Sequence, residues 1–234
     1  MYIAANDCNQ WTETIQNAVN LPKIERSLQK GIIVPNEKDR RNLGQKNAWE
    51  QFCHLNDIFP RYRIVSIDKL AIADDDEGSY RDKATRIVQN PRSLLLMGGA
   101  GRGKTHFMFA VLRAMFDANL MHIGDVRYFD NIELDRRIQE EVRRYKSAKD
   151  FIETISSVPI LIIDDFGTDT GTQRHERDFY EIFNKRFGRN LITFLSTNLT
   201  LKDIFALYGE RIASRLQDCV GIEFNGPDLR GKRI

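Results

Sequence analysis

The sequence predicts an α/β sandwich, in which helices cover both faces of a parallel β-sheet. From residue 64 onward, short apolar runs bounded by turn residues alternate with segments of helical periodicity. Strands buried on both faces of a parallel sheet give continuous apolar runs of this kind. One run leads into a glycine-rich loop, and another ends in two aspartates. Ligands bind at the carboxyl ends of the strands in such sheets, so we expect both features at one site.

The individual elements follow from the spacing of apolar and turn residues along the chain. We expect strands over residues 93–97, 125–129, 160–163, 191–196 and 220–224. We expect helices over residues 104–118, 131–145, 148–155, 172–187 and 201–207.

Composition predicts a globular protein with one main domain. Hydrophobic residues make up 41% of the 234-residue chain and charged residues 29%, values typical of folded proteins. The net charge is only +2, so contact with nucleic acid requires a local basic patch. Cys8, Cys53 and Cys219 show no CxxC spacing, so we expect reduced structural thiols and no zinc module. Without an apolar leader or spanning segment, we expect a cytoplasmic protein with no membrane partner.

The first part of the chain differs in character from the rest. Residues 1–60 contain polar, helix-prone pieces separated by Gly31 and Pro35, with too few apolar residues for a core of their own. We expect a small helical N-terminal region that docks on the main domain or on a partner. Residues 61–234 are expected to form the main domain.

Residues 98–105 read GGAGRGKT, between an apolar strand and an amphipathic helix. This order is that of the Walker A loop, in which backbone N–H groups cradle phosphates and the helix N-terminus adds a favourable dipole. Lys104 is expected to reach the β- and γ-phosphates of ATP, and Thr105 to bind Mg²⁺. The expected nucleotide-binding residues are Gly98, Gly99, Ala100, Gly101, Arg102, Gly103, Lys104, Thr105 and His106. The alternative is a flexible glycine turn.

The stretch VPILIIDDFG carries Asp164 and Asp165 at the end of a β-branched strand. This is the Walker B arrangement: Asp164 is expected to hold the Mg²⁺ shell, and Asp165 to polarise the water that attacks the γ-phosphate. A solvated acidic turn is the alternative. Asp165-Phe166-Gly167 also matches the DFG motif of protein kinases, but the other kinase motifs are absent.

Three further polar residues follow in the sequence. Asn198 ends the next apolar run, where it could hold the attacking water or serve as an ordinary turn residue. Arg211 and Arg215 lie four apart on one helix face, where they could pair with nearby acids. In an ATPase that assembles, such an arginine enters the neighbouring site and stabilises the transferring phosphoryl group. Arg230 is a further candidate for contacting phosphates within its own chain.

Together, GGAGRGKT, LIIDDFG, LSTN and GERIASRL resemble the DnaC/DnaI-type helicase loaders and the IstB-type transposition ATPases, within the AAA+ proteins. The resemblance covers residues 61–234 and implies an AAA+ P-loop fold with no full helical lid. It implies that Arg215 is a trans-acting arginine finger in a homo-oligomer, that Arg211 belongs to the same motif, and that Arg230 is the sensor 2 arginine. Asp165 departs from the family pattern, which more often has Glu there, and this predicts slow turnover.

A charged segment between the two Walker motifs is a candidate for DNA contact. Initiator-type AAA+ proteins insert a helix here that follows a DNA backbone. Its basic residues are Arg136, Arg137, Arg143, Arg144 and Lys146, which could neutralise phosphates. Acidic residues alternate with them, so a solvated helix with internal ion pairs is equally compatible.

The resulting hypothesis is an ATP- and Mg²⁺-dependent oligomer that places a DnaB-like replicative helicase on single-stranded DNA. A transposition ATPase that binds target DNA and recruits a transposase is the main alternative. A nucleotide-gated adaptor with negligible hydrolysis and a small-molecule P-loop kinase are the others.

Overall fold

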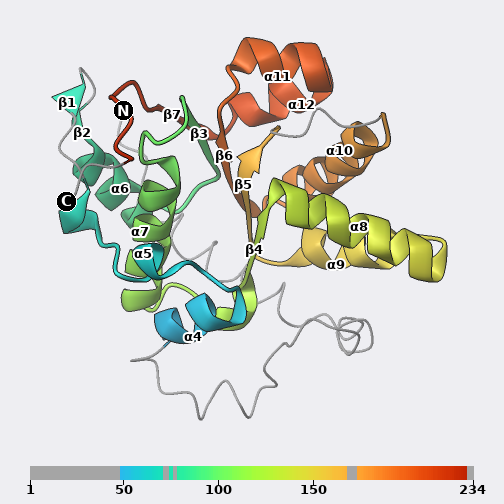
Figure 1. The fold of residues 1–234 in the computed structure, drawn as a ribbon, viewed down its shortest axis with the longest axis horizontal. Helices are drawn as coiled ribbons and strands as arrows, with labels where there is room; N and C mark the ends of the chain where they lie inside the picture. Colours follow the sequence, from blue (N-terminus) through green and yellow to red (C-terminus); the bar gives the residue numbers. More distant parts are fainter. Residues whose placement is uncertain (1–47, 71–73, 76–77, 168–172, 231–234) are drawn as a thin grey trace.

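The computed structural model describes residues 48–70, 74–75, 78–167 and 173–230. They form a three-layer α/β/α sandwich around a five-stranded sheet, so the predicted fold class is confirmed (Figure 1). The strands are β3 (Leu94–Met97), β4 (Val126–Asp130), β5 (Ile160–Phe166), β6 (Ile192–Thr197) and β7 (Val220–Glu223). Each of them overlaps a strand expected from the sequence.

The sheet has the order β4-β5-β6-β3-β7, and every neighbouring pair is parallel. The carboxyl ends of all five strands therefore lie on one edge of the sheet. Strand β3 lies between β6 and β7, so the loop that follows it opens near the middle of that edge. This order places the glycine loop and the aspartate pair close together.

The residues of β3 alternate between the two cores of the sandwich. Leu94 and Leu96 face one core and Leu95 and Met97 the other, as the period of two in a strand requires. The first core is covered by α4 (Ala48–Leu55), α6 (Tyr80–Gln89) and α7 (Lys104–Asp117). The second is covered by α8 (Asn131–Tyr145), α9 (Lys149–Ser157), α10 (Gln173–Gly188), α11 (Leu201–Tyr208) and α12 (Glu210–Gln217).

Several short elements before β3 were not expected from the sequence. They are α5 (Pro60–Arg63), the 3-10 helix η2 (Ile67–Lys69), the short hairpin of β1 (Asp74–Asp75) and β2 (Gly78–Ser79), and helix α6. A further 3-10 helix, η3 (Ile123–Asp125), precedes β4. Helix α6 is mostly polar and buries only Tyr80, Ala84 and Ile87, so few apolar residues mark it in the sequence. Its N-cap is Ser79, whose side chain accepts a hydrogen bond from the backbone N–H of Asp82.

Helix α4 packs in the same core as α7. Trp49 and Phe52 form ring contacts with Phe116, at 6.2 and 5.5 Å between centroids. The indole of Trp49 also donates a 2.8 Å hydrogen bond to the carbonyl of Arg63. The expected division at residue 60 thus falls inside a packed unit, and residues 48–60 lie on the main domain. The rest of the expected docking region, residues 1–47, lies outside the described residues.

A buried arginine joins the elements at the opposite edge of the sheet. Arg186, in the last turn of α10, is only 1% exposed. Its guanidinium donates hydrogen bonds to Thr193 Oγ1 and to four backbone carbonyls, those of Ile155, Val158, Pro159 and Ile192. Burial lowers its pKa to about 9. This one side chain ties α10 to the end of α9 and the starts of β5 and β6.

Within the described part of the chain, no helix is both long and apolar enough to cross a bilayer. Two of the three cysteines are described, and both are free. Burial raises the pKa of Cys53 to about 11 and that of Cys219 to about 12. Both thiols are therefore protonated at neutral pH, which makes them weak nucleophiles.

Candidate nucleotide-binding site

The glycine loop connects β3 to α7 in a conformation that only glycines allow at two positions. Gly98 has φ 134°, and a Cβ there would lie 2.4 Å from the carbonyl oxygen of Phe224. Gly101 has φ 74°, in the left-handed region that favours glycine. Glycine has no Cβ and so accepts both the backbone angle and the close neighbour. The spacing of the glycines therefore reflects the tight loop that phosphate binding requires.

Lys104 begins α7 and is 5% exposed. Its Nζ donates hydrogen bonds to the carbonyls of Gly98 and Gly99, at 2.7 and 3.0 Å, and to Asn198 Oδ1 at 2.8 Å. Burial lowers the pKa of this ammonium group, and the nearby Asp165 and Asp164 act in the opposite direction. The structure thus brings Lys104 and Asn198, which are far apart in the sequence, into direct contact.

Asp164 lies at the same edge on β5 and is also 5% exposed. Its Oδ1 accepts hydrogen bonds from Thr105 Oγ1 at 3.2 Å and from the hydroxyl of Ser196. Burial raises the pKa of this carboxyl, the Ser196 hydrogen bond lowers it, and the charge of Asp165 raises it. Thr105 and Asp164 therefore place two oxygen ligands beside the glycine loop.

A β-bulge separates the two aspartates. Ile163 pairs with Leu195 and Phe166 with Thr197, so Asp164 and Asp165 together face one residue of β6. Asp165 has φ 53°, an unusual backbone angle for a residue with a side chain, and it is exposed. The bulge explains how two consecutive residues of a strand both reach the same site.

Two tyrosines at the site were missed by the sequence analysis. The phenol of Tyr128, on β4, lies 3.5 Å from Asp164 Oδ2. Burial raises its pKa, and the charge of Asp164 raises it further. Tyr62, from α5, contacts the imidazole of His106 edge-on at 4.8 Å between ring centroids. Tyr128 could have been suspected from its place two residues before the end of a strand, whereas nothing in the sequence indicated that α5 reaches this helix.

The segment that follows β7 returns to the glycine loop. The N–H of Leu229 donates a 2.9 Å hydrogen bond to the carbonyl of Gly101, and Arg102 Nη1 donates a 3.0 Å hydrogen bond to the carbonyl of Phe224. The charges of Arg102 and Arg230 both lower the pKa of Lys104. The structure therefore brings Arg230 into the electrostatic environment of the loop.

The two arginines of α12 lie against α10. Arg215 donates a 2.7 Å hydrogen bond to Asn184 Oδ1 and lies over the rings of Tyr180 and Phe187, at 5.5 and 5.6 Å. Arg211 lies 6.0 Å from the ring of Tyr180. The expected alternative partners were nearby acids; the structure instead has Arg215 bonded to an amide and to the carbonyl of Arg211.

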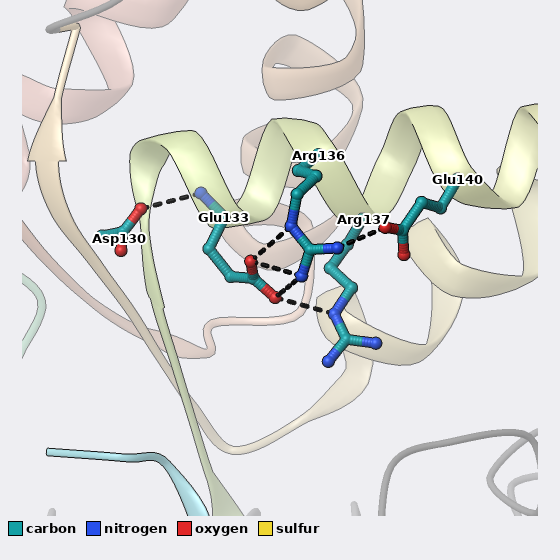
Figure 2. A network of polar contacts seen from close by, with 5 residues as sticks. All are labelled: Asp130, Glu133, Arg136, Arg137 and Glu140. Atoms are coloured by element: carbon teal, nitrogen blue, oxygen red, sulfur yellow. Dashed lines mark hydrogen bonds and ion pairs between the residues drawn. The ribbon is translucent and has the colours of Figure 1, made fainter.

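The basic residues of α8 divide into two groups, and Figure 2 shows the first of them. Arg136 is paired with Glu133 and Glu140, and Arg137 is paired with Glu133. At the end of the helix, Arg143, Arg144 and Lys146 are exposed and form none of the ion pairs found among the described residues. The first half of α8 is thus the internally paired helix that was one of the two expectations.

The donor set at the strand edge fits Mg²⁺ bound together with a nucleotide. Among the residues the structure describes, no cluster of three or more His, Cys, Asp or Glu side chains could hold a metal ion. Mg²⁺ does not require one, because it is commonly held by one or two protein oxygens together with phosphate oxygens and water. The 3.2 Å contact between Thr105 Oγ1 and Asp164 Oδ1 shows that two such oxygens can approach one ion.

These features define the class: the chain is an ATPase with the AAA+ fold. It belongs to the family of the bacterial DnaA ATPase domain, which matches residues 72–223. The chromosomal replication initiator protein DnaA of Thermus thermophilus is 27% identical over 231 residues, covering 92% of this chain and 48% of that protein. The chain therefore spans about half the length of this curated relative.

Solved structures show the same fold. The DnaC helicase loader superposes with a TM-score of 0.62 at 21% identity, covering 71% of this chain and all of that one. A replication initiator DnaA bound to AMPPCP and single-stranded DNA superposes with a TM-score of 0.59 at 18% identity, covering 73% of this chain and 51% of that one. The chain thus shares its fold with DnaA and with the DnaC helicase loader, and the expected resemblance to helicase loaders is confirmed.

Proposed function

We propose that this protein is an ATP-dependent helicase loader that assembles into an oligomer and delivers a replicative helicase to single-stranded DNA. The observation that carries the ATP-dependent part is the contact network of Lys104, Thr105, Asp164 and Asn198 at one edge of the sheet. The fold shared with the DnaC helicase loader supports the loading part.

Within this proposal, residues 98–106 bind the triphosphate. When ATP binds, Lys104 would exchange its loop carbonyls for phosphate oxygens, and Asn198, which now contacts Lys104, would lie close to them. Thr105 and Asp164 hold Mg²⁺, which when bound neutralises phosphate charge and polarises the phosphoryl group. Asp165 orients the attacking water, and Arg230 contacts the phosphates from the C-terminal segment.

Arg215 is assigned to the neighbouring subunit's site, with Arg211 beside it. In this structure Arg215 bonds to Asn184 on α10 of its own chain. An arginine finger supplied in trans raises the hydrolysis rate by about 10³–10⁵ in P-loop enzymes. Arg215→Ala is therefore expected to bind ATP normally and to hydrolyse it far more slowly.

Mixing two inactive variants tests this assignment. Lys104→Ala lacks the phosphate ligand but keeps Arg215, whereas Arg215→Ala keeps an intact nucleotide site. Mixed oligomers then contain sites with both residues, and we expect ATPase activity to return on mixing. If Arg215 acts within its own chain, the mixture stays inactive.

The helicase-loading step is tested by size exclusion with light scattering, using the protein and its host's replicative helicase with and without ATP. A stable complex supports the loader. Residues 1–47 are the proposed docking region, so a chain that begins at Ala48 is expected to lose the complex and keep ATP binding. ATP-dependent assembly of many copies of the protein on duplex DNA, without a helicase complex, favours the transposition ATPase instead.

The DNA-contacting part of the proposal rests on the end of α8. Arg143, Arg144 and Lys146 are exposed, whereas Arg136 and Arg137 are paired with acids. Replacing the first three by alanine is expected to weaken single-stranded DNA binding and reduce its salt dependence. Replacing the paired arginines should have a smaller effect.

A second candidate is a replication initiator that acts on DNA directly. The family match to the bacterial DnaA ATPase domain favours it, as does the DnaA structure solved with single-stranded DNA. ATP-dependent binding to single-stranded DNA without any helicase complex would select this candidate over the loader.

A further inference from the structure

One serine contacts both aspartates of the site. Ser196, the penultimate residue of β6, is fully buried, with 0% of its surface exposed. Its hydroxyl donates a hydrogen bond to Asp164 Oδ1 and accepts one of 2.9 Å from the backbone N–H of Asp165. A hydroxyl can donate and accept at once, so a single side chain links the carboxylate of one aspartate to the backbone of the other.

The bulge in β5 creates the need for this contact. Two residues of β5 face Ser196 alone, and a bulge leaves a backbone group without its ladder partner. A buried N–H without an acceptor costs free energy. The N–H of Asp165 donates to the Ser196 hydroxyl at 2.9 Å and also to Asp164 Oδ1 at 3.2 Å. The φ of 53° at Asp165 carries a cost that these contacts help to offset.

Thr197, the next residue of β6, bonds to Phe166, the first residue after the bulge. Thr197 Oγ1 donates a 2.7 Å hydrogen bond to the carbonyl of Phe166 and accepts one of 3.0 Å from the N–H of Leu199. Asn198, which contacts Lys104, lies between Thr197 and Leu199. The end of β6 therefore holds the bulge from both sides.

We propose that Ser196 is a positioning residue that sets the geometry of Asp164 and Asp165 through its two hydrogen bonds. This inference rests on the proposed ATPase roles of the two aspartates. Ser196 orients the carboxylate of Asp164 beside Thr105 and holds Asp165 in the bulged conformation that turns it outward. It touches neither nucleotide nor water in the reaction.

The test compares Ser196→Ala with Ser156→Ala in the full chain. Ser156, in α9, is equally buried, and its hydroxyl has no hydrogen-bond partner, so it controls for loss of a buried hydroxyl far from the site. In Ser196→Ala we expect kcat to fall about 10- to 100-fold, as for other residues that orient metal ligands. KM for ATP should stay within about threefold, because the glycine loop is intact.

Two readouts do not depend on turnover. In the nucleotide-free protein, hydrogen exchange at the Asp165 amide should be about tenfold faster in Ser196→Ala and unchanged in Ser156→Ala. The Mg²⁺ concentration that gives half-maximal binding of a fluorescent ATP analogue should rise about tenfold, while binding without Mg²⁺ stays the same.

A double variant separates positioning from packing. If Ser196 acts through Asp165, adding Ser196→Ala to Asp165→Asn should lower kcat much less than it does in the wild type. Additive effects, or a Ser196→Ala protein with wild-type Mg²⁺ dependence and amide exchange, would overturn the inference. A wild type that binds Mg²⁺ and ATP without hydrolysis would overturn the proposed ATPase role alone, and the exchange and Mg²⁺ readouts would still decide the role of Ser196.

Discussion

Asp164 is a site residue whose buried environment disfavours its ionised form. Burial raises the pKa of its carboxyl above the ordinary 3.8, so folding favours the protonated form. A raised pKa means that the stability contributed by the protonated group is present at low pH and is lost as pH rises through the folded value. At neutral pH this carboxyl therefore lowers the stability of the nucleotide-free protein.

Asp164→Asn should consequently be more stable than the wild type at pH 7 without nucleotide. The amide has nearly the same shape, and it can still accept the hydrogen bonds of Thr105 and Ser196. The gain should shrink as the pH is lowered toward the ordinary carboxyl range, where this carboxyl is protonated in the unfolded chain as well as in the folded protein. Urea unfolding at several pH values measures this, and an Asn variant less stable than the wild type at pH 7 would contradict it.

At the scale of elements, Arg186 is the side chain that, among the described residues, donates hydrogen bonds to the most backbone carbonyls. Arg186→Leu removes five hydrogen bonds. The carbonyl of Pro159 keeps the N–H of Ile192 as a donor, but a carbonyl left buried without a donor costs about 1–3 kcal/mol. We expect the free energy of unfolding to fall by about 2–4 kcal/mol. Arg189→Met is the control, because Arg189 pairs with Glu153 at the surface, where a bridge contributes about 0–1 kcal/mol. Equal losses in chemical denaturation would refute this role.

Helix α4 makes a second prediction at this scale. Phe52 is fully buried against α7, whereas Leu55, in the same helix, is 46% exposed. Phe52→Ala should lower the free energy of unfolding by about 3–5 kcal/mol, and Leu55→Ala by about 0.5 kcal/mol or less. Thermal unfolding distinguishes them. A small effect of Phe52→Ala would mean that α4 is not part of the domain core.

Elements with strong apolar runs were predictable, and those held by tertiary contacts were not. The run before Asp164 could only be a buried strand, and β5 begins at the expected Ile160. It continues to Phe166 because Thr197 and Phe166 pair beyond the bulge, which no local pattern indicates. Helix α4 was assigned to a separate region because its sequence is short and its partner, Phe116, is distant in the chain.

The site was predictable to the same extent. Lys104, Thr105 and Asp164 could be assigned because phosphate and Mg²⁺ binding demand those residue types after a strand. Tyr128 and the contacts of Ser196 with the two aspartates were not predicted, because both depend on strand order, which places β6 and β4 on either side of β5. A hydroxyl within an apolar strand carries no sign of what it faces.

At the scale of the whole molecule, the proposed function requires assembly. If Arg215 completes the site of a second copy, each active site needs two chains, and specific ATPase activity should fall as the protein is diluted below its dissociation constant. ATP affinity per site should stay nearly constant over the same range. Activity independent of protein concentration, in a sample shown to be monomeric, would contradict the shared site.

The nucleotide site itself is tested by Mg²⁺-dependent ATP binding and hydrolysis in the wild type and in Lys104→Ala. We expect the wild type to bind and hydrolyse ATP. Lys104→Ala should bind it about 10- to 150-fold more weakly, since a hydrogen bond to a charged group contributes about 1.5–3 kcal/mol, and should not hydrolyse it. Lys202→Ala, an exposed lysine on α11, should match the wild type. Unchanged ATP binding in Lys104→Ala would contradict the assignment of this edge of the sheet as the nucleotide site.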